Sequence, residues 1–68
     1  MSTFKDILSD LMTCHDLSQR ELAAEIGTSN ATISRLVTGK SEYPDTKTLI
    51  SLADFFGVST DYLLGREQ

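Results

Sequence analysis

Residues 18–40 decide the fold of this chain, and they read SQRELAAEIGTSNATISRLVTGK. A capping box opens this segment, because the Ser18 hydroxyl and the Glu21 carboxylate can each accept a backbone N–H at the start of a helix. Gly27 and Gly39 each follow apolar residues at helical spacing, and glycine readily takes the left-handed conformation in which helices end. The pattern predicts two short helices with a tight turn between them.

The turn determines how these two helices pack. The first is expected near 19–26 and the second near 30–37, so only the three residues GTS join them. Helices of about two turns are unstable alone, so contact between them must hold both in place. A short connection with a left-handed glycine imposes a steep crossing, and the small side chain of Ala23 permits close approach. We therefore predict a helix-turn-helix at about 18–38.

The remaining helices are predicted from the same kinds of signal. Asp45 and Ser59 are N-cap candidates, while Gly57 and Gly65 follow segments with apolar residues at helical spacing. The expected helices lie near 3–14, 46–56 and 60–64. No stretch alternates convincingly with a period of two, so the predicted fold class is all-α, with five helices in one compact domain.

Length and composition limit the class of protein. With 68 residues the chain has room for one small core, so residues 1–68 are predicted to form a single domain. Apolar residues make up 40%, enough for a packed fold. No apolar run approaches the ~20 residues of a membrane span, and a single cysteine cannot form an internal disulfide. These features favour a cytoplasmic protein, with no membrane partner, that is stabilised by packing.

The net charge of −4 is unusual for a protein that binds phosphates, because such proteins are usually basic. The charges are not evenly spread, however. Between Ser18 and Lys47 the counts are equal, with Arg20, Arg35, Lys40 and Lys47 against Glu21, Glu25, Glu42 and Asp45. The whole acidic surplus therefore lies outside this segment, and we expect only weak non-specific affinity for nucleic acid.

The outward face of the helix near 30–37 carries the candidate chemistry. With Ile33 and Leu36 turned inward, the residues left outside are polar or small, and no acid occurs from Gly27 to Lys40. In the major groove, Asn can pair with adenine, Arg with guanine, and Ala or Thr can contact the thymine methyl. A solvated face without function is the alternative, although such faces usually mix Glu and Lys. The residues concerned are Asn30, Ala31, Thr32, Ser34 and Arg35.

Neighbouring residues can hold a DNA backbone. Gln19 opens the helix near 19–26, where its amide and the exposed N–H groups can meet a phosphate. Lys40 and Lys47 are also candidate phosphate contacts, because one follows the outward-facing helix and the other lies in the first turn of the next. Asp45 can instead pair with Lys47.

The segments LSQRELAAEIGTSNATISRLVTGK and LADFFGVSTDYLLG resemble the Cro/CI-type (XRE-like) helix-turn-helix repressors of phages and bacteria, over about Phe4 to Gly65. The resemblance implies a lambda-repressor-like fold, with the third of five helices in the DNA major groove. It also implies a transcriptional regulator, most simply a repressor, that binds a two-fold symmetric operator as a homodimer. The positions that commonly meet DNA in the family correspond to Gln19, Ser29, Asn30, Ala31, Thr32, Ser34 and Arg35.

Two departures from that family pattern affect the expected binding. Many relatives carry an Arg in the first helix and a Glu at the end of the third, whereas this chain has Met12 and Val37. We predict that Met12 packs on Val37, an apolar contact that avoids desolvating an ion pair. The loop before the fourth helix is often basic in lambdoid relatives, but here Glu42 should repel a phosphate. Tyr43 is expected to pack against the core rather than to offer its hydroxyl.

No feature of the sequence predicts an enzyme. Cys14, His15 and Asp16 are consecutive and so do not share a helix face, and one Cys with one His cannot complete a zinc site. We expect His15 near the last carbonyls of the first helix. The sequence therefore predicts no catalytic residue, no metal, no cofactor and no small-molecule ligand.

The C-terminal part is rich in large apolar residues, and one or two of them are expected to be exposed as a dimer surface. The set is Phe55, Phe56, Tyr62, Leu63 and Leu64.

The main rival to a DNA-binding regulator is a protein-interaction module, antitoxin-like or antirepressor-like, on the same fold. The net charge and the acidic loop favour that rival. A third interpretation is that the chain is the N-terminal domain of a longer repressor.

Overall fold

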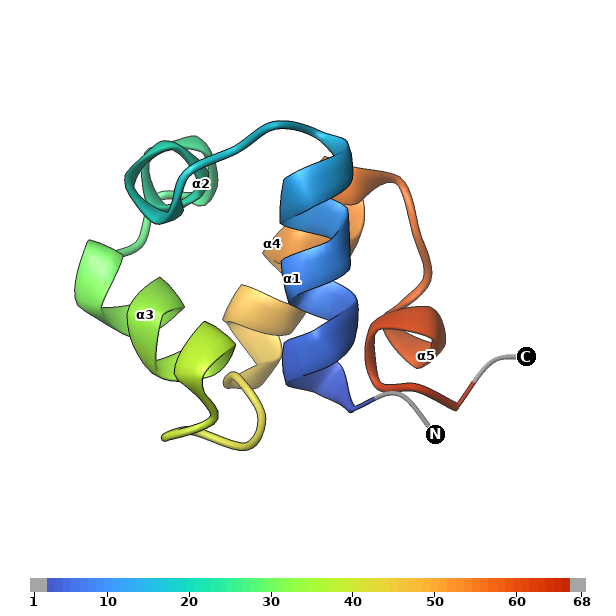
Figure 1. Cartoon of the computed structure of the whole chain (residues 1–68). Helices are drawn as coiled ribbons and strands as arrows, with labels where there is room; N and C mark the ends of the chain where they lie inside the picture. Colours follow the sequence, from blue (N-terminus) through green and yellow to red (C-terminus); the bar gives the residue numbers. More distant parts are fainter. Residues whose placement is uncertain (1–2, 67–68) are drawn as a thin grey trace.

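A computed structural model describes residues 3–66, which fold into helices without a strand. The helices are α1 (Phe4–Cys14), α2 (Gln19–Ile26), α3 (Asn30–Thr38), α4 (Thr46–Phe56) and α5 (Thr60–Leu63). In Figure 1, α2 and α3 lie on one side of α1, α5 lies on the other, and α4 passes behind. The all-α fold with five helices is confirmed, and every boundary lies within one residue of its predicted position.

Side-chain caps explain where the helices begin. At α2 the Glu21 N–H donates to the Ser18 hydroxyl over 3.1 Å, and the Ser18 N–H donates to the Glu21 carboxylate over 2.9 Å. The predicted capping box is therefore present. Sequence reasoning missed a second one, in which Thr3 and Asp6 cap α1, so this helix begins at Phe4. Asp45 is the N-cap residue of α4, but its side chain makes no capping hydrogen bond.

Each helix contributes apolar side chains from one of its faces to the core. Its buried members are Phe4, Leu8, Met12, Leu22, Ala23, Ile33, Leu36, Leu52, Ala53, Phe56 and Leu63. Burying a side chain of the size of Leu stabilises the fold by about 1.5–3 kcal/mol, so these positions hold the short helices together. Ala23 is buried on α2, which packs against α3, and the close approach that its small side chain would permit stays a prediction.

Two residues outside the helices settle further predictions. His15 caps the C-terminus of α1, where its N–H donates to the Leu11 carbonyl over 3.0 Å, and its ring meets the edge of Phe56. The expected position of His15 is thus confirmed. Tyr43 only partly follows its prediction, because its ring lies 6.3 Å from the ring of Phe4 but remains 53% exposed. The loop that carries Tyr43 runs over the surface, so only one side of the ring reaches the core.

The apolar C-terminal set divides between core and surface. Phe56 and Leu63 are buried, whereas Phe55 on α4 and Tyr62 on α5 are 36% and 42% exposed. Ile50 on α4 is exposed as well. None of the helices in residues 3–66 has the length and apolar character needed to cross a membrane.

Candidate nucleic-acid interface

The turn between α2 and α3 fixes the orientation of the outward-facing helix. Gly27 takes the left-handed conformation, with φ of 74°, and the next N–H donates to the Ala23 carbonyl over 2.9 Å. Ser29 then caps α3 by accepting the Thr32 N–H over 3.1 Å. Because Ile33 and Leu36 are buried, α3 packs on the core through the face that carries them. Its outer face is left to solvent.

The structure places the predicted base-contacting residues on or beside that outer face. Asn30, Ala31 and Arg35 are exposed, whereas Thr32 and Ser34 are half-buried at its edges. The Thr32 hydroxyl lies 2.9 Å from the Ser29 hydroxyl, so these two groups hold each other as well as the helix N-terminus. Apart from the apolar Ala31 and the long side chain of Arg35, these residues are short and polar.

Arg35 on α3 and the two lysines predicted to contact phosphates have no carboxylate partner within the described part of the chain. Arg35, Lys40 and Lys47 are all exposed, and no ion pair involves any of them among residues 3–66. The alternative in which Asp45 pairs with Lys47 is therefore not realised in this structure. Unpaired cations remain available to phosphate oxygens or base edges.

Gln19 stands at the first position of α2, half-buried, beside a shallow hollow of about 410 Å³. The hollow is lined by Ser9, Met12, Thr13, Leu17, Ser18, Gln19 and Val37. Met12 is buried and Val37 is half-buried, so both predicted partners border the same space, as an apolar replacement for an ion pair requires. Their direct contact stays a prediction.

Hydrogen bonds also set the electrostatics at the start of α2. The backbone N–H of Ser18, followed by its hydroxyl, lowers the pKa of the Glu21 carboxyl below its ordinary value of 4.5. Glu21 is therefore charged at neutral pH and faces the positive end of the α2 dipole. Glu21, the acidic residue in the first turn of α2, therefore stabilises the start of the helix.

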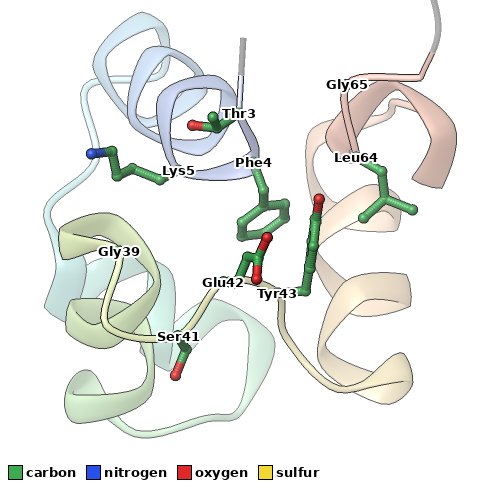
Figure 2. Close-up of a pocket in the computed structure, with 9 residues that line it drawn as sticks. All are labelled: Thr3, Phe4, Lys5, Gly39, Ser41, Glu42, Tyr43, Leu64 and Gly65. Atoms are coloured by element: carbon green, nitrogen blue, oxygen red, sulfur yellow. The ribbon is translucent and has the colours of Figure 1, made fainter.

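The acidic residue of the loop between α3 and α4 borders a cavity near the start of α1. Glu42 and Tyr43 line a cavity of about 360 Å³ between the start of α1 and the end of α5, and Figure 2 shows the Glu42 carboxylate pointing toward the rings of Phe4 and Tyr43. Lys5, which the sequence analysis did not single out, lines the same cavity and lies over Gly39. Lys5 precedes Ser9 by four residues and Thr13 by eight, a spacing that predicts that the three side chains share one side of the first helix.

Comparison with known proteins agrees with this geometry. Residues 15–63 match the model of the family HTH_3, described as Helix-turn-helix. The chain is 35% identical over 65 residues to the HTH-type transcriptional activator BcrR of Enterococcus faecalis, covering 96% of this chain and 31% of that protein. It is 37% identical over 51 residues to the HTH-type transcriptional regulator ImmR of Bacillus subtilis, covering 75% of this chain and 39% of that protein.

Two further matches come from a prophage and from a solved structure. The SPbeta prophage-derived uncharacterized HTH-type transcriptional regulator YonR of Bacillus subtilis is 38% identical over 61 residues, or 90% of this chain and 56% of that protein. The crystal structure of a transcriptional regulator from Listeria innocua superposes with a TM-score of 0.86 at 32% identity, covering 97% of this chain and 61% of the other. The chain thus spans about a third to just over half of the length of these curated relatives. It belongs to the HTH_3 helix-turn-helix family, the XRE/Cro/CI type of DNA-binding transcriptional regulators, and not to an enzyme family.

Proposed function

We propose that this domain binds double-stranded DNA sequence-specifically by inserting α3 into the major groove, and that it represses transcription by occluding polymerase. The observation that carries the proposal is the outer face of α3, which is exposed, free of acids and supplied with an unpaired Arg35. In this arrangement Asn30 and Arg35 contact base edges, and Ala31 meets a thymine methyl. Ser29, Thr32 and Ser34 border these contacts at the N-terminal end and edge of the helix.

Phosphate contacts fix the register of α3 on the duplex. Gln19 supports one end of the interface from the start of α2, and the exposed Lys40 and Lys47 support the other. Two ammonium groups per protomer are few for a DNA-binding protein. In a dimer, these four contacts should contribute about −4 to the slope of the logarithm of the affinity against the logarithm of salt concentration.

The proposed DNA-bound form is a homodimer on a two-fold symmetric operator. Half-sites one helical turn apart place the two α3 helices about 34 Å from each other. The domain measures 29 × 24 × 22 Å, so two copies at that separation lie side by side with little space between them. The exposed Phe55 and Tyr62 offer apolar surface for such a contact.

The second candidate function is a protein-interaction module on the same fold. The net charge of −4 and the exposed aromatic rings of Tyr43 and Tyr62 favour it. It differs from the first candidate in needing no affinity for phosphates.

A titration separates the two functions. The protein is added to its own promoter region and to a mixed-sequence duplex at several salt concentrations. Tighter binding to the promoter, weakening as salt rises, supports the DNA-binding proposal. Absence of binding to both duplexes at low salt overturns the DNA-binding proposal in favour of the interaction module.

A promoter–reporter assay then tests repression, because an increase in transcription on adding the protein would contradict that role.

A further inference from the structure

A lysine of α1 lies over the C-terminal end of α3. A Cβ atom built on Gly39 would stand 3.3 Å from the Cδ atom of Lys5 and 3.9 Å from its Nζ atom. Gly39 ends α3 with φ of 83°, and the proposed phosphate contact Lys40 is the next residue. The aliphatic stem of Lys5 therefore lies over the end of α3, and its ammonium group lies close to Gly39, the residue before Lys40.

The charge of Lys5 is not neutralised, and its side chain borders the neighbouring cavity without being directed at Glu42. Figure 2 shows its side chain extending past Gly39, away from Glu42 and Tyr43. The residue is exposed, and no ion pair involves it among residues 3–66. The negative end of the α3 dipole favours a cation at this place, which accounts for the position of the stem but leaves the ammonium group open to solvent.

Lys5 also begins a polar edge that runs along α1 to the other end of the interface. Ser9 and Thr13 follow it at intervals of four residues, so the three side chains share one side of the helix over about 12 Å. Ser9 and Thr13 line the hollow that Gln19 borders. The Thr13 hydroxyl donates to the Ser9 carbonyl over 3.0 Å, whereas the Ser9 hydroxyl has no partner within residues 3–66.

We propose that Lys5 contacts a DNA phosphate. The polar edge of α1 then lies along one DNA strand, and Gln19 and Lys40 contact phosphates of the same strand at the two ends of this edge. The inference rests on the DNA-binding function proposed above. Along one strand the charges rise about 3.4 Å per nucleotide, so an edge of this length faces more than one phosphate. Lys5 lies at the end of α3 and not on its outer face, so it positions the domain without reading bases.

The test compares Lys5→Gln with Arg66→Gln, since each removes one positive charge. Arg66 follows α5, which lies across α1 from α3 in Figure 1, so its loss changes the net charge equally but at a distance. Affinity is measured for the promoter region and a mixed-sequence duplex across several salt concentrations. For Lys5→Gln we expect weaker binding to both duplexes by a similar factor, and a salt slope reduced by about 1 per protomer. Lys5→Arg should restore both quantities, and Arg66→Gln should leave them near those of the unaltered protein.

The outcomes distinguish this inference from the function on which it rests. If the unaltered protein binds DNA with salt-dependent affinity but Lys5→Gln behaves as Arg66→Gln does, Lys5 makes no phosphate contact and the inference fails alone. If the unaltered protein binds neither duplex, both proposals fail. Helix content and thermal stability of each variant are measured by circular dichroism. Lys5→Gln should keep both close to those of the unaltered protein. A loss of affinity that is explained by unfolding of Lys5→Gln would contradict the inference.

Discussion

The predicted packing of Met12 on Val37 leads to a quantitative prediction about stability. Met12 is only 7% exposed, so Met12→Ala removes almost a whole buried side chain, a change that costs about 2–5 kcal/mol. The hollow beside Met12 is open, so the new space joins it instead of forming a closed cavity, which places the cost near 2 kcal/mol. Val37 is half-buried, and Val37→Ala should cost about 1 kcal/mol.

Contact between the two side chains makes these costs non-additive. In the double variant, the second truncation removes surface that has already lost its partner. The free energy of unfolding should therefore fall by at least about 0.5 kcal/mol less than the sum of the single effects. The unaltered domain is expected to unfold at a cost of about 3–10 kcal/mol, and the double variant should lose about 2.5 kcal/mol of it.

Urea denaturation followed by the helical circular dichroism signal measures these free energies. Met12→Ala combined with Ile50→Ala serves as the control, because Ile50 is exposed on α4 and its effect should simply add to that of Met12. Additivity of Met12→Ala and Val37→Ala to within about 0.3 kcal/mol would refute the packing of one side chain on the other.

Three further predictions concern the cap of α3, the cap of α2 and the proposed dimer surface. Ser29→Ala removes the acceptor for the Thr32 N–H and should lower the free energy of unfolding by about 1 kcal/mol in the same urea experiment, whereas an unchanged value would count against the cap. The pKa of Glu21 is lower in the folded state than its ordinary value of 4.5, so its stabilising contribution is complete above that pH and is lost as pH falls through the lowered pKa. Thermal unfolding across this range should show the loss, and Glu21→Gln should abolish that part of the pH dependence; an equal pH dependence in both proteins would contradict it. Phe55→Ser together with Tyr62→Ser should weaken dimer formation on DNA in sedimentation experiments while the helix content persists, and an unaltered dimer would exclude this surface.

The local signals of the sequence predicted the fold well because helix ends here depend on neighbouring residues. Ser18 and Glu21 specify a helix start within four residues, and Gly27 marks its end. The cap at Thr3 was missed because Asp6 supplies the returning carboxylate where a Glu or Gln is the usual residue. Local chemistry of this kind needs no knowledge of the tertiary structure.

The parts that escaped prediction depend on contacts between distant segments. Nothing near Tyr43 in the sequence indicates that its ring meets Phe4 while half of its surface stays in solvent. Lys5 and Gly39 are likewise far apart in the chain, and only the packing of α1 against α3 brings them together. The outer face of α3 could be predicted because its residues follow from the burial of Ile33 and Leu36 on the same helix.

The central claim is that the outer face of α3 reads bases. The most direct test is how far Arg35→Ala reduces the preference of the protein for its promoter region over a mixed-sequence duplex. Affinity is measured for the promoter region and for a mixed-sequence duplex at one salt concentration, with Arg66→Ala as the control that removes an equal charge away from α3. If the outer face of α3 reads bases, Arg35→Ala should weaken promoter binding by about 1–3 kcal/mol more than binding to the mixed sequence. An equal loss for both duplexes, or no loss beyond that of Arg66→Ala, would contradict the account.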